Sequence, residues 1–144
     1  MDHQLSPDGT HTAAQLALVR RQISLWETNN DSMKASADWL PEGVLTAPRG
    51  IRVATADILG VITGWHDEFT NLKVDLRSLV ASADGTWLAI EWTWDVTRKS
   101  DGARSVTFDA IIVELREGKI LQWREYFDTF GSVEFDSAPG AALG

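Results

Sequence analysis

The sequence predicts an α+β fold in which three N-terminal helices lie on one face of an antiparallel sheet. Two observations predict it. Apolar residues recur every three or four positions up to about residue 69, and at every second position beyond it. In the second half of the chain, acid-glycine pairs recur at the spacing expected for the turns of successive hairpins. Helices followed by such a meander are typical of α+β proteins.

The first helix is predicted to begin after Thr12, a residue suited to capping it, and to end near Asn29 and Asn30. Its buried stripe is predicted to comprise Leu16, Val19, Ile23 and Trp26. Leu18 and Leu25 fall on the opposite side of this helix. We expect them to contact another subunit or to be exposed.

Two further helices are predicted before the meander. A short one covers residues 33 to 38, and an irregular segment and a brief strand around residues 44 to 47 follow it. A long one runs from about residue 55 to residue 69. Its predicted buried stripe consists of Ile58, Val61, Ile62, Trp65 and Phe69.

Four strands with one buried face each make up the predicted meander. Asp84-Gly85, Asp101-Gly102 and Glu117-Gly118 supply the turns between them. The strands are predicted at about residues 72 to 82, 86 to 99, 103 to 116 and 119 to 128.

Length and composition predict one domain over residues 1–144, with an ordered core at about 12–130 and flexible ends. The chain has no cysteine, no signal-like start and no apolar run of membrane-spanning length, so we expect a cytoplasmic protein. Its formal net charge of −8 argues against nucleic acid and anionic membranes as partners. Neither metal-ligand spacing nor a glycine-rich phosphate loop occurs, so we expect no metal and no cofactor.

An acid lies on the apolar side of the last predicted strand. Because side chains alternate along a strand, Glu125 shares a face with Trp123 and Phe127. A three-residue loop at 116 to 118 would place Asp109 opposite Glu125, Ile111 opposite Trp123 and Thr107 opposite Phe127. A two-residue turn would slip the register by one and remove this pairing.

Two carboxylates side by side in an apolar site cannot comfortably both ionise. One pKa is pushed upward, so that Asp109 and Glu125 can hold an acid and a base together near neutral pH. The competing interpretation is that either acid is structural and accepts a hydrogen bond from a tryptophan indole or pairs with an arginine. His66 is the only histidine in a predicted element, and it is a base candidate or a structural residue at a helix end.

Aromatic side chains are predicted to surround this pair. Trp65, Trp92, Trp94 and Trp123 would line one space, with Phe127 helping to shape it. Such residues often form plain core, but several neighbouring tryptophans in so small a domain favour an irregular cavity. Small-molecule sites are mostly apolar with few polar groups, so the predicted partner is a small apolar organic molecule.

Residues 118 to 128 read Gly-Lys-Ile-x-x-Trp-Arg-Glu-Tyr-Phe-Asp. With the order of helices and strands over residues 12 to 130, this motif resembles the nuclear transport factor two-like superfamily. Within it, the SnoaL-like polyketide cyclases and the limonene-epoxide-hydrolase branch are the most similar. The resemblance implies a cone-shaped roll of curved sheet wrapped by helices, with a deep apolar pocket, and often a homodimer through the outer sheet face.

The resemblance also implies a function. In SnoaL-like cyclases an acid stands at the place of Glu125, with a second titratable group near Asp109. The implied activity is acid-base chemistry without a cofactor, by a cyclase, isomerase, dehydratase or hydratase. A non-catalytic small-molecule-binding protein of the same fold is the alternative. Epoxide hydrolysis has less support, because tryptophans and the pair Leu45 and Ala47 stand where that branch places its polar partners.

Overall fold

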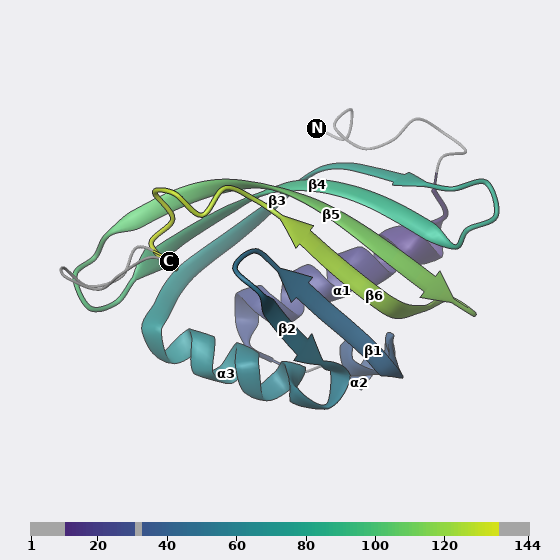
Figure 1. The fold of residues 1–144 in the computed structure, drawn as a ribbon, viewed down its shortest axis with the longest axis horizontal. Helices are drawn as coiled ribbons and strands as arrows, with labels where there is room; N and C mark the ends of the chain where they lie inside the picture. Colours follow the sequence, from purple (N-terminus) through teal and green to yellow (C-terminus); the bar gives the residue numbers. More distant parts are fainter. Residues whose placement is uncertain (1–10, 31–32, 136–144) are drawn as a thin grey trace.

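A computed structural model describes residues 11–30 and 33–135 of this chain. A six-stranded sheet curves over the helices, and α1 and α3 lie under its concave side (Figure 1). The elements in chain order are α1 (Ala13–Thr28), α2 (Met33–Ala37), β1 (Trp39–Ala47), β2 (Ile51–Ala54), the short 3-10 helix η2 (Thr55–Asp57), α3 (Ile58–Glu68), β3 (Phe69–Ala81), β4 (Trp87–Arg98), β5 (Arg104–Arg116) and β6 (Lys119–Tyr126).

The α+β class is confirmed, and the sheet is mostly antiparallel. Its strand order is β2-β1-β6-β5-β4-β3. Strands β3 to β6 form the expected meander, while β1 joins the sheet beside β6 as the one parallel pair among the described residues. The β1 and β2 hairpin precedes α3, so only two of the three helices come before every strand.

Strand β1 begins earlier than the sequence predicted, and β2 was not predicted at all. Pro41 and Gly43 made the segment after Trp39 read as irregular, because proline lacks a donor and glycine weakens a strand. The structure accommodates both residues with a bulge: the register of β1 against β6 shifts between Trp39 and Val44. Strand β2 has only four residues, too few for a clear alternation.

Gly43 sits where a side chain has no room. A Cβ there would lie 2.8 Å from Thr55 Oγ1, 2.9 Å from the Ile120 carbonyl oxygen and 3.0 Å from the Leu40 carbonyl oxygen. Two of these atoms belong to the backbone and cannot turn aside. The Thr55 hydroxyl in turn donates to the Leu40 carbonyl at 2.7 Å, which ties the bulge to the start of η2.

Gly43→Ala is therefore expected to lower the free energy of unfolding by about 1 to 3 kcal/mol, as overpacking commonly does. Urea denaturation measures it. Gly60→Ala in α3 is the matched control, since nothing lies within 4 Å of its would-be Cβ. Alanine replaces glycine inside a helix there, so the control should gain up to ~1 kcal/mol. Equal stability of Gly43→Ala and the wild-type protein would contradict the close packing.

Helix α1 is capped as predicted. The Thr12 hydroxyl accepts from the Gln15 amide at 3.1 Å, and the Gln15 side chain accepts from the Thr12 amide at 2.7 Å. Such a reciprocal capping box satisfies two otherwise unpaired donors. At the other end Asn29 adopts the left-handed conformation, with φ 51°, and closes the helix.

The expectation that Leu18 and Leu25 face another subunit or solvent is wrong. Their exposed fractions are 3% and 2%. They form a stripe with Gln22, whose side chain donates to the Ala35 carbonyl of α2 at 2.9 Å and accepts from the Trp39 indole at 3.0 Å. The start of β1 and α2 therefore cover this side of α1, a contact that the helical period alone could not show.

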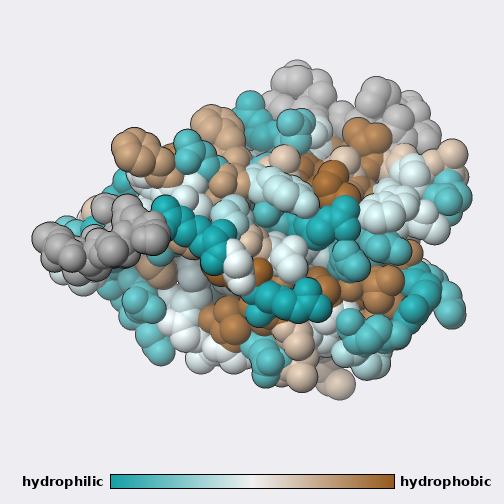
Figure 2. All heavy atoms as spheres, viewed as in Figure 1, coloured by the Kyte–Doolittle hydropathy of each residue, from teal (hydrophilic) through white to brown (hydrophobic). Residues whose placement is uncertain are grey.

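The outer face of the sheet carries both polar and apolar side chains. Val106 and Phe108 alternate with the inward-facing residues of β5 and are 48% and 75% exposed. Tyr126 pairs with Ala110 on the same outer side and is 55% exposed. On the face seen in Figure 2, hydrophobic residues form separate groups divided by hydrophilic ones.

Candidate functional site

A cavity of about 220 Å³ lies between the concave face of the sheet and the helices, and residues from almost every element line it. Six lining residues are aromatic: Trp26, Trp65, Phe69, Trp94, Phe127 and Phe135. Six are aliphatic: Leu45, Ala47, Ile51, Val53, Ile58 and Val61. The remaining four are Thr107, Asp109, Glu125 and Glu134, so three of the four polar residues are acids.

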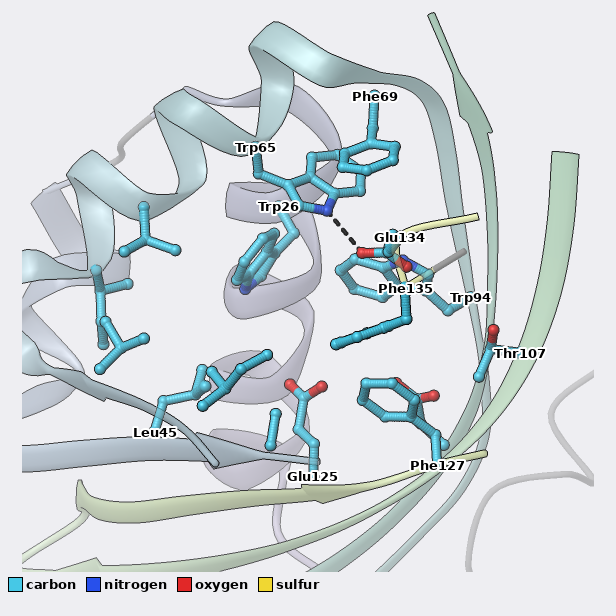
Figure 3. Close-up of a pocket in the computed structure, with 16 residues that line it drawn as sticks. Trp26, Leu45, Trp65, Phe69, Trp94, Thr107, Glu125, Phe127, Glu134 and Phe135 are labelled. Carbon is cyan, nitrogen blue, oxygen red and sulfur yellow. Dashed lines mark hydrogen bonds between the residues drawn. The ribbon is translucent and has the colours of Figure 1, made fainter. Parts of the chain in front are cut away.

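Glu125 points from β6 into this cavity (Figure 3). Its Oε2 accepts a hydrogen bond of 2.8 Å from the indole nitrogen of Trp123, two residues earlier on the same face of the strand. Burial raises the pKa of Glu125 to about 8, and the nearby charge of Asp109 adds to the rise, while the Trp123 bond opposes it. The side chain can therefore hold a proton at neutral pH.

Asp109 lies on β5 and is 6% exposed. Its Oδ2 accepts from the Trp92 indole at 3.0 Å, but its Oδ1 is buried without a hydrogen-bond partner. Burial is the main cause that raises the pKa of Asp109 from its ordinary 3.8 to about 7; the charge of Glu134 contributes to the rise and the Trp92 bond opposes it. A buried acceptor without a partner is unusual in a folded protein, and the residue that carries it is among those that line the cavity.

Glu134 is a third acid, and sequence analysis missed it. It follows the last strand, in a segment assigned to a loose end because of its glycine and serine content. The chain returns to the sheet there: Val133 is 6% exposed, and its amide donates to the Ser105 hydroxyl at 3.0 Å. Glu134 comes into the cavity from the side facing Glu125, and its Oε2 accepts from the Trp65 indole at 2.6 Å (Figure 3).

Burial also raises the pKa of Glu134, and the indole groups of Trp65 and Trp94 oppose the rise. The Trp94 nitrogen forms no hydrogen bond of ordinary geometry and is buried. The signal that could have identified Glu134 is the run Val-Glu-Phe at 133 to 135, in which an acid stands between two apolar residues.

Each acid is thus held by one tryptophan, and the tryptophans contact one another. The pairs are Trp92 with Asp109, Trp123 with Glu125, and Trp65 with Glu134. Ring centroids lie 5.5 to 6.3 Å apart along a continuous chain through Trp65, Trp26, Trp94, Trp92, Trp123 and Trp39. Such contacts fix ring orientations, and they therefore orient the N–H groups that hold the carboxylates.

The predicted register between β5 and β6 is wrong by two residues. Glu125 pairs with Ile111, and Trp123 pairs with Val113, so Asp109 is a diagonal neighbour of Glu125. The loop has two residues, Glu117 and Gly118, with φ of 53° and 78°, the left-handed pair of a type I′ turn.

The two-residue turn alone would place Glu125 on the opposite side of the sheet from Asp109, and a bulge returns it to the same side. Arg116 pairs with Lys119, but the register shifts by one between Glu114 and Leu115, so that Glu114 pairs with Gln122. The extra residue returns Glu125 to the side of the sheet that carries Asp109. Both carboxylates therefore border one cavity although the turn differs from the predicted one.

The predicted site residues fall into two groups. Those that line the cavity are Trp65, Trp94, Thr107, Asp109, Glu125 and Phe127. Those that are buried without lining it are Trp92, Ile111 and Trp123, with exposed fractions of 1%, 0% and 2%. Two members of the second group, Trp92 and Trp123, contribute by donating to the acids.

His66 does not line the cavity. Its Nε2 lies 2.6 Å from the Trp26 carbonyl oxygen, and its ring packs edge-on against Trp65. A carbonyl can only accept, so Nε2 carries the proton of this hydrogen bond. This contact supports the structural interpretation of His66, as a link between α3 and α1.

Within residues 11–30 and 33–135, no three His, Cys, Asp or Glu side chains lie close enough together to hold a metal ion. In the same part of the chain, no helix is long and apolar enough to span a membrane.

A curved sheet closed by helices over a deep apolar cavity defines the NTF2-like class of proteins. The chain belongs to the SnoaL-like domain family, whose profile matches residues 19–123. None of the curated proteins matches it in sequence.

Solved structures share the fold at low identity. An LEH-like epoxide hydrolase of M. tuberculosis is 17% identical, with a TM-score of 0.69 over 85% of this chain and 89% of that one. A proposed polyketide cyclase of Xanthomonas campestris is 16% identical, with a TM-score of 0.67 over 81% and 92%. A protein of Catenulispora acidiphila with a ketosteroid isomerase-like fold, in complex with trimethylamine, is 15% identical, with a TM-score of 0.70 over 81% and 89%.

Proposed function

We propose that this protein is a cofactor-independent acid-base enzyme that acts on a small, largely apolar molecule. The observation that carries the proposal is the pair Asp109 and Glu125, which border one apolar cavity with pKa values raised to about 7 and about 8. General acid-base catalysis is most effective when the catalytic pKa lies near the working pH. One carboxyl group can then donate a proton while the other accepts one.

Glu125 is the acid/base in this proposal, because it points into the open part of the cavity (Figure 3). Asp109 is its proton-sharing partner, and the aromatic lining excludes water and holds the apolar body of the substrate. Cyclisation, isomerisation, dehydration and hydration all use such proton transfers. Distant structural neighbours proposed to be cyclases and isomerases support this range.

One observation favours the alternative, a binding protein without turnover. Every acid in the cavity accepts a hydrogen bond from a tryptophan, as a structural carboxylate would. A carrier should tolerate replacement of either acid by its amide, whereas an enzyme should not. Epoxide hydrolysis by a triad with arginine has the least support, since no arginine is among the described residues that line the cavity.

Turnover tests the proposal directly. Ketones, enols and epoxides of polyketide-like size are incubated with the protein without added metal in deuterated water, and NMR follows both product formation and exchange of protons next to the carbonyl group. Wild-type protein should accelerate one of these reactions, and the double variant Asp109→Asn, Glu125→Gln should not. Equal rates for both proteins across the panel would favour the carrier.

We also propose that two copies associate through the outer face of the sheet. The side chains of this face include Glu91, Thr93 and Asp95 of β4, and the exposed Val106 and Phe108 of β5. A phenylalanine 75% exposed at the middle of a sheet face is a typical anchor for a protein interface.

Light scattering at micromolar concentration is expected to give about twice the chain mass of 15.9 kDa. Phe108→Asp should give a monomer, because it places a charge in the contact, while Glu117→Gln at the exposed hairpin loop should leave the mass unchanged. A wild-type mass of one chain would refute the dimer.

A further inference from the structure

The cavity carries acids without a compensating base. The described residues that line it include three carboxyl groups and no lysine, arginine or histidine. Buried charges are normally paired, because an unpaired charge in an apolar site is costly. The groups that would neutralise these acids must therefore be protons or a cation that enters from outside.

Two buried atoms of the lining residues lack partners, Trp94 Nε1 and Asp109 Oδ1, and only the second of them can accept from a donor. Asp109 is 6% exposed and its Oδ1 accepts no hydrogen bond, although its Oδ2 is held by Trp92 at 3.0 Å. Asp109 is also among the residues that line the cavity. A ligand N–H would satisfy Oδ1 and bring positive charge to an acid that has none beside it.

The aromatic lining suits a cation as well. Trp26 packs edge-on against both Trp65 and Trp94, with ring centroids 5.8 and 5.5 Å apart, and all three rings border the cavity. Indole faces attract cations, most strongly where water is excluded. Acids and tryptophans that surround one space form the arrangement that recognises organic ammonium groups.

We propose that the cavity binds a small protonated amine with an apolar body, the ammonium group facing the acids Asp109, Glu125 and Glu134 that line it. This inference rests on the proposed function only in taking the same cavity as the ligand site. It narrows the substrate class from any small apolar molecule to an amine. A neutral ligand of the same shape would leave the acids without a counter-charge.

The proposal predicts how binding depends on pH. The pKa values of Asp109 and Glu125 are raised to about 7 and about 8, so these two acids ionise progressively between about pH 5 and about pH 8. Burial raises the pKa of Glu134 as well. Ionised acids attract an ammonium ion, and affinity should rise over this range. A neutral ligand should show no such rise.

Other titratable groups near the cavity face elsewhere. On α1, the Glu27 carboxylate accepts from the Val74 amide at 2.8 Å. On α3, His66 is engaged with the Trp26 carbonyl oxygen. The described lining residues from β1 and β2 are aliphatic. The pH dependence should therefore come from the three acids.

Benzylamine and benzyl alcohol are the probes, because they share one shape and differ in charge. Isothermal titration of the whole protein at about pH 8 should give an affinity for the amine at least about tenfold higher than for the alcohol, the scale of a desolvated cation–π contact with an ion pair. Glu134→Gln should reduce the preference severalfold, and its amide oxygen can still accept from Trp65. Glu117→Gln removes the same charge from the hairpin loop and should change nothing.

Equal affinities for the two probes, or no binding of the amine, would overturn the inference. So would an amine preference that survives in the triple variant Asp109→Asn, Glu125→Gln, Glu134→Gln. These outcomes are independent of turnover. Amine binding without any catalysis would uphold the ligand class and reject the enzyme, and catalysis on neutral substrates with no amine preference would do the reverse.

Discussion

Glu125→Gln is expected to lower kcat by roughly 100- to 10,000-fold, the usual worth of a general acid/base. Glutamine keeps the size of the side chain and can still accept from the Trp123 indole, which now lies 2.8 Å from Glu125 Oε2. It cannot transfer a proton. The KM should change far less than kcat, because the aromatic lining still holds the apolar body of the substrate and Asp109 and Glu134 still face its charged group, and steady-state kinetics on the substrate found by screening separates the two constants.

Stability is the control for this variant. Removing an acid whose charged form is disfavoured by burial should leave the thermal midpoint level or raise it. Glu117→Gln, which alters an exposed loop outside the cavity, should keep full activity. An unchanged kcat would remove Glu125 from the mechanism, and loss of folding would return it to the structural role that its bond with Trp123 allows.

The fold is expected to become more stable by several kcal/mol as the pH is lowered from about 8 to about 5. Burial, as the largest cause, raises the pKa of Asp109 from 3.8 to about 7 and that of Glu125 from 4.5 to about 8. In this window the folded state holds protons that the unfolded chain has released, so the free energy of unfolding falls as pH rises. Each unit of difference in pKa corresponds to ~1.4 kcal/mol.

Acids with lowered pKa values do not obscure this effect. Hydrogen bonds from Thr86 and Ser82 lower the pKa of Asp84 to about 2, and Arg98 does the same for Asp101, so both stay ionised throughout the window. Their contribution to stability is lost only at lower pH. The window from about pH 5 to about pH 8 therefore excludes the titration of these two acids, and comparison with a variant that lacks the cavity pair isolates Asp109 and Glu125.

Urea denaturation across this range measures the effect, with the double variant Asp109→Asn, Glu125→Gln as the comparison. The two acids share their protons, so only the sum of their titrations is interpretable. The variant should show a much smaller change in the free energy of unfolding with pH. The same slope in both proteins would mean that these carboxyl groups are ionised in the folded state.

Local patterns predicted most of the fold. The capping residue Thr12, the change of period near residue 69 and the acid-glycine turns placed helices and strands within a few residues of their observed bounds. Such local patterns do not show which helices and strands contact one another. Leu18 and Leu25 were assigned to the wrong environment because the covering role of α2 depends on tertiary packing.

The candidate site was predicted less completely. Side-chain alternation placed Glu125 on the inner face, but the pairing with Asp109 was derived from a loop type that does not form. The type I′ turn and the bulge after it each shift the register by one residue, so together they leave Glu125 on the predicted inner face of the sheet. Glu134 escaped prediction because nothing in its local composition indicates that the chain turns back onto the sheet after β6.

After β6 the chain returns to the sheet, so that one wall of the cavity is made by residues that belong to no helix or strand. The sheet ends at Tyr126, yet Phe127, Glu134 and Phe135 all come from the residues beyond it, and the two phenylalanine rings lie 5.6 Å apart. This tail is anchored by the Ser105 hydroxyl, which accepts from the Val133 amide, by Arg98, which donates to the Val133 carbonyl, and by Trp65, which donates to Glu134. Exchange of residues 127 to 135 between homologues that keep these anchors would therefore replace one wall of the cavity and leave the sheet and helices unchanged. Exchange of this tail alone would then change which ligands the cavity prefers while the fold stays the same.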